Sequence, residues 1–213
     1  MSERKIQYYN QIYRVDGKNV FLEVLNNAFN IGKGKVNINF VKYDDSGITE
    51  KIDIYIDLPK ALLLCNDILS GKLAKTVALA LKEGKFENKP VNDYTSYFVN
   101  MGGKNEEAAK REDGMALSKQ FKIQKGNKVP WIFRAEIGPG KSNETGLIVP
   151  QGKAEKFINV PLTDDDLKIF ALLLEKHINA YITHVYLDHA KDFYPYEKIN
   201  IFKPISANSN KNK

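Results

Sequence analysis

The sequence predicts an α+β fold in which a set of antiparallel β-strands followed by an apolar helix occurs twice. Three observations lead to this prediction: strand-like alternation at residues 117–162, an apolar helical run at 163–187, and the same succession at 5–69. Because each alternating sheet has one apolar face, a covering helix completes a two-layer unit. We expect one domain over residues 1–189, with repeats at 5–71 and 75–187, and a partly disordered extension over 190–213.

The strands of the second repeat show the clearest patterns. Residues 129–137 and 156–162 alternate between apolar and polar side chains, which predicts that one face of each strand is buried. Residues 117–125 alternate in the same way, with Phe121 on the apolar face. Lys119 interrupts that apolar face, so we expect that it lies near a sheet edge or that its side chain extends outward to solvent.

The helix that ends this repeat has a strong start signal. Thr163 precedes three aspartates, which places a hydroxyl at the N-cap and negative charges in the first turn. From Leu167 to Val185, apolar residues occupy more than one face of the helix. The surplus predicts that the helix packs on its own sheet and also on another copy of the chain, giving a dimer or a tetramer.

The first repeat shows the same kinds of signal. Asp16-Gly17 predicts a turn, Asp57 is expected to cap a helix that begins at Leu58-Pro59, and Gly71 is expected to end that helix. The other predicted segments are strands at residues 5–15, 35–43 and 51–58, a strand or short helix at 19–29, a strand or helix at 76–81, and a mobile hairpin tip or loop at 101–116.

Composition narrows the class of protein. A hydrophobic content of 43% is enough for a core, and no apolar run approaches the roughly 20 residues that span a bilayer. The N-terminus lacks the apolar region of a secretory signal. Cys65 is the only cysteine, so it forms no internal disulfide, and it lies in an apolar run typical of a core residue. We therefore expect a cytoplasmic protein without a membrane partner.

Positive charge is concentrated in the second repeat. Residues 117–157 contain eight basic and three acidic residues, a balance of +5 within a total of +6. Such a concentration is typical of a surface that binds a polyanion. The alternative is that these lysines only keep strands and turns soluble.

Motifs for catalysis or metal binding are weak. Residues 135–142 resemble a relaxed phosphate-binding loop, but Pro150 and Gly152 follow where a helix is required, so we expect a hairpin turn with an exposed lysine. His177 and His184 are two helical turns apart, too far to share a metal. We expect no enzyme activity, no cofactor and no metal.

Lysines, amides and aromatic rings on the outward faces of the strands suit single-stranded nucleic acid. Lysines follow the phosphates while bases stack on aromatic rings. The predicted contacts are Lys33, Lys35, Asn37, Asn39, Tyr43, Lys51 and Tyr55 in the first repeat, and Lys119, Lys122, Arg134, Lys141, Lys153, Lys156 and Phe157 in the second. For the aromatic positions, cover by a neighbouring subunit is the alternative.

Two strands-then-helix units, with Lys33-Gly34-Lys35 leading into a strand, resemble the Whirly proteins, which belong with the positive-cofactor-type transcriptional coactivators. In Whirly proteins Lys-Gly-Lys is followed by Ala-Ala-Leu, whereas Val36-Asn37-Ile38 follow here. The resemblance implies sequence-tolerant binding of single-stranded DNA and helices that pack into dimers or tetramers. Small members of the family occur in bacteriophages and mobile elements.

The sequence therefore predicts a single-stranded DNA-binding protein that acts in replication, recombination or transcription. Two alternatives stay open, namely an RNA-binding protein on the same scaffold and a structural or assembly protein that binds no nucleic acid.

Overall fold

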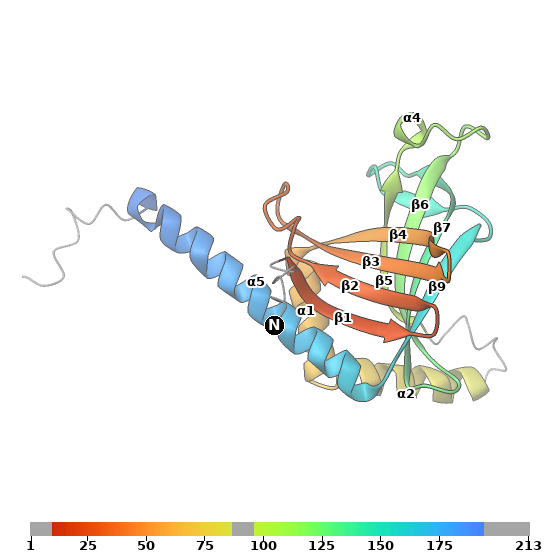
Figure 1. The fold of residues 1–213 in the computed structure, drawn as a ribbon, viewed down its shortest axis with the longest axis horizontal. Helices are drawn as coiled ribbons and strands as arrows, with labels where there is room; N and C mark the ends of the chain where they lie inside the picture. The colour runs from red at the N-terminus through yellow and green to blue at the C-terminus, as the bar shows by residue number, and fades with distance from the viewer. Residues whose placement is uncertain (1–9, 87–95, 194–213) are drawn as a thin grey trace, which may run out of the picture. The chain divides into compact units, whose positions relative to one another are not determined.

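The structure is a computed structural model that describes residues 10–86 and 96–193 (Figure 1). Two antiparallel sheets and helices build it, which confirms the predicted α+β class. The described elements are β1 (Gln11–Gly17), β2 (Val20–Leu25), β3 (Lys35–Asp44), β4 (Gly47–Asp57), α1 (Leu58–Leu69), α2 (Lys72–Phe86), β5 (Ser96–Lys104), α4 (Glu106–Ala109), β6 (Ala116–Lys125), β7 (Trp131–Ser142), β8 (Ile148–Pro150), β9 (Lys156–Leu162) and α5 (Asp164–Phe193).

Sheet 1 has the strand order β1-β2-β3-β4. Its inward face is mainly aliphatic: Ile38 of β3 is directly opposite Ile54 of β4, and both are almost fully buried. The segment predicted as a strand or short helix is strand β2. The predicted turn at Asp16-Gly17 is wrong by two residues, because Gly17 still pairs with Val20 and the loop consists of Lys18 and Asn19. Asn19 has φ 59°, a conformation that asparagine tolerates better than most residues.

Sheet 2 has the order β5-β6-β7-β8, and β9 also pairs with β7. The twelve residues of β7 make this possible, since residues 131–137 pair with β9 and residues 140–142 with β8. The predicted hairpin turn within residues 135–142 is therefore wrong: this segment is strand, and the turn follows at residues 143–146. The Asn143 side chain holds that turn by accepting hydrogen bonds from the backbone N–H groups of Thr145 and Leu147.

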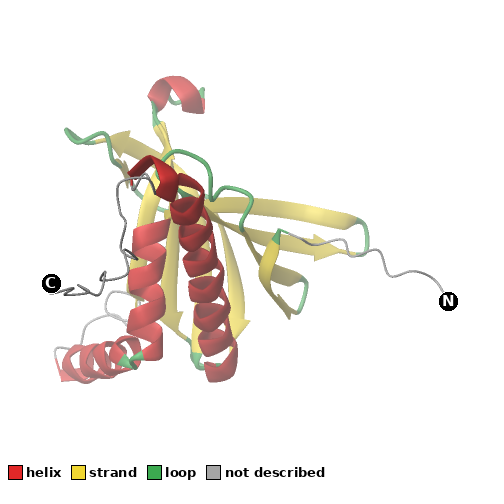
Figure 2. Ribbon diagram, turned by 90° about the vertical axis from the view of Figure 1, so that its left-hand side faces the viewer, coloured by secondary structure: helices red, strands yellow, loops and turns green. Residues whose placement is uncertain are grey.

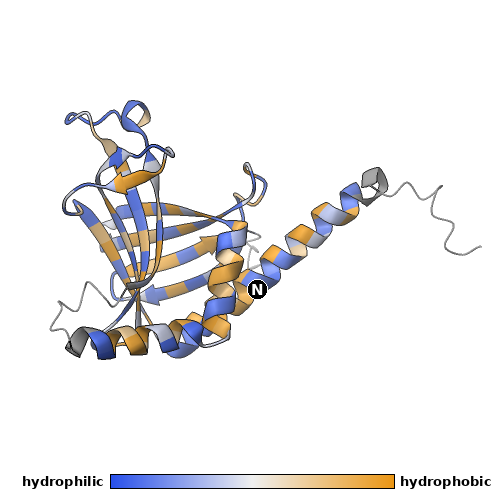
Figure 3. Ribbon diagram, turned by 180° about the vertical axis from the view of Figure 1, so that it is seen from behind, coloured by the Kyte–Doolittle hydropathy of each residue, from blue (hydrophilic) through white to orange (hydrophobic). Residues whose placement is uncertain are grey.

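A line of phenylalanine rings joins the two sheets and the last helix. Phe121 of β6 lies 5.6 Å from Phe40 of β3 and 5.1 Å from Phe133 of β7, and Phe133 lies 5.1 Å from Phe170 of α5. All four rings are fully buried. The strands of the two sheets run in different directions (Figure 1), and alternating hydropathy along them is visible as bands (Figure 3). The apolar bands supply the shared core.

Helices α1 and α5 begin where the sequence predicts. α1 starts at Leu58, but the Asp57 side chain makes no capping hydrogen bond and instead binds Lys35 Nζ at 2.8 Å. α2 settles the strand-or-helix alternative for residues 76–81 as helix. At α5, Thr163 Oγ1 accepts a hydrogen bond from the Asp166 N–H, and the Asp166 carboxylate accepts one from the Thr163 N–H. α1 and the first half of α5 lie side by side against the strands (Figures 1 and 2).

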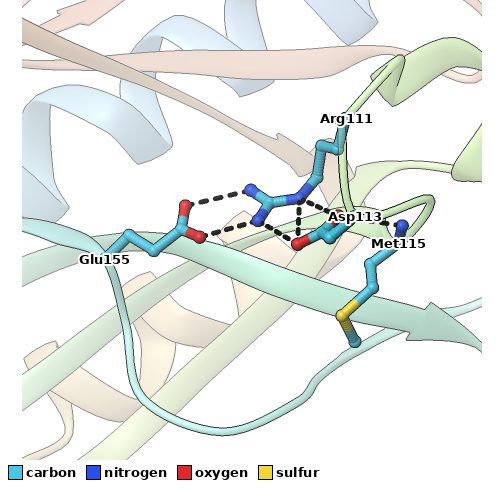
Figure 4. Close-up of polar contacts among 4 residues, drawn as sticks. All are labelled: Arg111, Asp113, Met115 and Glu155. Carbon is cyan, nitrogen blue, oxygen red and sulfur yellow. Dashed lines mark hydrogen bonds and ion pairs between the residues drawn. The ribbon is translucent and has the colours of Figure 1, made fainter.

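The predicted hairpin tip is confirmed, because residues 105–115 connect the antiparallel strands β5 and β6. β5 continues to Lys104, and a capped turn of helix, α4, follows it. Arg111 then binds Asp113 and Glu155 at 2.6 Å each, which ties this segment to the loop before β9 (Figure 4). The sequence did not predict this tie, because Glu155 lies 44 residues from Arg111.

Contacts divide the chain into two compact units, Met1–Ile178 and Asn179–Lys213. Both sheets belong to the first unit, and the described part of the second is the end of α5. Within the described residues, no helix combines the length and apolar character needed to cross a membrane.

Candidate nucleic-acid interface

A groove lies between the outer edge of β4 and the strands of sheet 2. We call it the β4 groove; its volume is about 580 Å³, and a shallower hollow that shares Lys35 and Asp57 continues it toward α1. The polar and aromatic residues that line the groove and its continuation are Lys33, Lys35, Asp53, Tyr55, Asp57, Lys60, Asn100, Lys104 and Lys119.

Side chains of sheet 2 close the edge of β4. Lys119 Nζ donates a hydrogen bond to the Asp53 carbonyl at 3.1 Å, and Asn100 Nδ2 donates one to the Tyr55 carbonyl at 3.1 Å. Because these donors occupy edge carbonyls, an added strand is not able to pair with them. The predicted position near a sheet edge is wrong, because Lys119 is on the central strand β6 and pairs with both Gly102 and Ile137. Its side chain instead reaches the edge strand of the other sheet. Burial lowers the pKa of Lys119, although the nearby Asp53 charge opposes this shift.

The β4 groove is electropositive. Five lysines and two aspartates line the groove and its continuation, which leaves an excess of three positive charges. The Lys35–Asp57 ion pair neutralises one lysine locally. Lys60 donates a hydrogen bond to the Val99 carbonyl at 3.3 Å, and burial lowers its pKa, with Asp57 opposing the shift. Lys104 of the groove and Lys33 of its continuation are both exposed.

One exposed aromatic ring and two exposed aliphatic side chains also line the β4 groove. Tyr55 is 46% exposed on β4, and Ile31 and Leu147 are 53% and 37% exposed on flanking loops. Flat apolar surfaces beside lysines are what a single strand needs, because its bases are free to stack while its phosphates meet cations.

Only part of the predicted site is gathered in this groove. Lys33, Lys35, Tyr55 and Lys119 line it or its continuation. Lys60, Asn100 and Lys104 also line it, but they were not predicted, because they lie in a helix, on an inward strand face and at the end of β5. Their approach to β4 depends on how the sheets pack, for which the sequence has no local signal.

The other predicted residues of sheet 1 are less available than strand alternation implies. Asn37 and Asn39 are on the outer face, but each is only 5% exposed, and their side-chain oxygens have no hydrogen-bond partner among the described residues. Tyr43 packs against Phe21 with 5.9 Å between ring centroids. Lys51 Nζ lies 3.2 Å from an Asp53 carboxylate oxygen, at ion-pair distance.

The predicted residues on the outer face of sheet 2 bind one another. Glu136 accepts hydrogen bonds from both Lys122 and Arg134, and the Arg134 guanidinium lies 4.0 Å from the centre of the Phe157 ring. Burial would raise the pKa of Glu136, but these two hydrogen bonds outweigh it and the pKa lies below the ordinary value. Lys122 and Arg134 therefore share one carboxylate, which leaves this group with a net charge of +1, whereas Lys141, Lys153 and Lys156 are exposed.

Metal-ligating side chains are not gathered anywhere among the described residues. No group of three or more histidine, cysteine, aspartate or glutamate side chains is placed to hold a metal ion there. Cys65 is buried in α1, and burial raises the pKa of its thiol to about 12, with the nearby Glu175 charge adding to the shift.

Comparisons with protein-family models, with curated proteins and with solved structures give no match to this chain.

Proposed function

We propose that this chain is a sequence-tolerant single-stranded DNA-binding protein, which acts where replication, recombination or transcription exposes single strands. The observation that carries the proposal is the β4 groove, where lysines from four separate segments line the groove and its continuation together with the half-exposed Tyr55 ring. Lysines give sequence-independent affinity for phosphates, and a ring stacks on any base. The strands-helix-strands-helix order is also what the resemblance to Whirly proteins implies.

We also propose that the chain forms a homo-oligomer, a dimer or tetramer, through α5. Leu167, Phe170 and Leu174 of α5 are buried in the core. On the opposite side of the helix, Leu172 and Leu173 are 45% and 38% exposed, and Ile169 beside them is 44% exposed. A helix that is apolar on two opposite sides has a second face that self-association would bury.

The central experiment measures fluorescence anisotropy of a labelled single-stranded oligonucleotide over a series of salt concentrations. On a single strand, the slope of log affinity against log salt is about −0.7 per neutralised phosphate. Replacing Lys33 and Lys104 together by alanine removes two exposed cations of the β4 groove. The slope should become shallower by about 1.4 if each meets one phosphate.

The matched control replaces two exposed lysines of α2, Lys75→Ala and Lys82→Ala, which removes the same charge away from the groove. We expect the control to keep the wild-type slope. Equal slopes for the two double variants would reject the β4 groove as the binding track, and absence of binding at low salt would reject the proposed function.

Competition defines the strand type. Bases of a duplex are paired and stacked, so the Tyr55 ring has no free base to contact, and single-stranded DNA should outcompete duplex DNA of the same length. Equal competition by duplex would leave only a generic basic surface. A single-stranded RNA competitor separates DNA binding from RNA binding on the same scaffold.

A further inference from the structure

A second cavity, of about 450 Å³, lies on the outer face of sheet 2, which we call the outer slot. Its floor is formed by Ser118, Gln120 and Lys122 of β6 with Glu136 of β7, and Pro139 and Pro150 stand at its sides. Ser118 and Gln120 point to the opposite face of β6 from Lys119, because successive side chains of a strand alternate. The outer slot and the Lys119 end of the β4 groove therefore belong to different faces of sheet 2.

The strand register places no side chain on either side of Ser118. Across the three neighbouring strands, Gly103 of β5 and Gly138 of β7 are the direct partners of Ser118. Since Gly138 has no side chain, the loop before β9 is able to approach the sheet closely at this row. The next row contains Gln120 opposite Glu136, so polar groups continue along the floor.

The loop between β8 and β9 forms a fixed wall of the outer slot. Its backbone donates hydrogen bonds to sheet 2 at both ends, from Gln151 N to Pro139 O at 2.8 Å and from Glu155 N to Ile137 O at 2.9 Å. Arg111 holds the Glu155 carboxylate from the other side (Figure 4). A Cβ on Gly138 would lie 3.2 Å from the Ala154 Cα, so glycine permits this close approach. The cavity is therefore preformed.

One buried polar group of the floor lacks a partner among the described residues. Ser118 is 2% exposed, and its hydroxyl makes no hydrogen bond there. Buried polar side chains are nearly always hydrogen-bonded, and an unmet group costs about 1–3 kcal/mol. Gln120, two residues along the same strand, also lines the cavity and is 8% exposed. An unmet hydroxyl on the floor of a preformed cavity indicates a ligand that supplies the missing partner.

We propose that the outer slot binds a nucleobase, with adenine as its preferred ligand. The Gln120 amide offers one donor and one acceptor side by side, which is the complement of the adjacent amino group and ring nitrogen of adenine. Pro150, which the register places on the same face of the sheet as Ser118, provides an apolar surface for one face of a planar ring, as in pockets that hold an unstacked base. The exposed Lys153 on the wall is placed to meet a phosphate attached to the base.

This inference goes beyond the proposed strand-binding function, because a free nucleotide is enough to test it. Isothermal titration calorimetry measures binding of adenosine monophosphate and of adenosine to the full chain. The Gln120→Leu variant removes the amide, and Gln124→Leu is the matched control, since it makes the same change on the same face of β6 outside the outer slot. Loss of a bidentate amide–adenine pair should weaken binding about tenfold to a hundredfold.

A second variant keeps the test valid if Gln120→Leu fails to fold. Lys153→Ala changes an exposed loop residue and should weaken binding of adenosine monophosphate while leaving adenosine unaffected. Absence of nucleotide binding to the wild-type chain at millimolar concentration would overturn the proposal. Unchanged affinity in Gln120→Leu, or equal loss in Gln124→Leu, would also overturn it.

Oligonucleotides identify the source of the base. If a bound strand supplies it, the wild-type chain prefers oligo-dA to oligo-dT, and Gln120→Leu abolishes that preference without changing the salt slope. If a free nucleotide is the ligand, Gln120→Leu weakens only mononucleotide binding. Both results support nucleobase binding in the outer slot. Neither depends on whether replacing Lys33 and Lys104 changes the salt slope, so the two proposals are tested separately.

Discussion

Replacement of Phe121 by alanine should be among the most destabilising single changes in this protein. Phe121 is fully buried, and its ring contacts Phe40, Phe98 and Phe133 at centroid distances of 5.6, 5.7 and 5.1 Å. These partners belong to β3, β5 and β7, so one side chain links sheet 1 to sheet 2. Its removal leaves a cavity at the junction of the two sheets.

The expected loss follows from burial and ring contacts. A buried Phe→Ala change costs about 3–5 kcal/mol. Each aromatic pair contributes about 0.5–1.5 kcal/mol beyond its buried area, so loss of three pairs places this site at the upper end, near 5 kcal/mol. Domains have a total stability of about 5–15 kcal/mol, and the variant should therefore be close to unfolding. Phe121→Leu retains most of the volume and should cost about 1–2 kcal/mol.

Urea denaturation followed by circular dichroism measures the free energy of unfolding of each variant. Phe157→Ala is the control, because Phe157 is 50% exposed and contacts mainly the Arg134 guanidinium. We expect the control to lose about 1 kcal/mol, the scale of an exposed cation–π contact. A loss below about 2 kcal/mol for Phe121→Ala, or equal losses at the two positions, would show that this ring does not join the sheets.

Three further predictions concern association, acidity and thiol reactivity. Leu172→Glu should shift the mass measured by light scattering toward the monomer, whereas Leu79→Glu on α2 should leave it unchanged, since a charge opposes burial only at the α5 contact; a monomeric wild-type chain would contradict this. Arg111 lowers the pKa values of the two carboxylates it binds, that of Asp113 to about 2. The two ion pairs of Arg111 stabilise the fold fully at pH values above the ordinary carboxyl pKa, and this stabilisation is lost as pH falls through the lowered pKa values. The difference in melting temperature between wild type and Arg111→Gln should therefore narrow from about pH 4.5 to about pH 2. A difference that stays constant with pH would be evidence against the ion pairs of Arg111 with Asp113 and Glu155. Cys65 should resist a thiol reagent at pH 8 in the folded chain and react in urea, because burial raises its pKa to about 12; rapid reaction of the folded chain would show that Cys65 is accessible.

Local patterns in the sequence were sufficient for the elements and their inward faces. The start of α5 depends on Thr163 and Asp166, three residues apart, and the strand faces depend on a period of two, so neighbouring residues contain the whole signal. The prediction failed where the local pattern was weaker. Gly138 and Gly140 led to the prediction of a turn within residues 135–142, but pairing with β6, β8 and β9 keeps this segment extended.

The tertiary structure alone decided which polar groups are available to a ligand. Alternation assigns Asn39 and Gln120 to outer faces, but both are buried. Lys122 was predicted to meet phosphates, but strand register and packing bring Glu136 to it, and Lys119 reaches a carbonyl 66 residues away. A strand period determines the side to which a residue points. Exposure and charge depend on strands and loops that are distant in the sequence, and for this reason the β4 groove and the outer slot emerge only when the sheets are assembled.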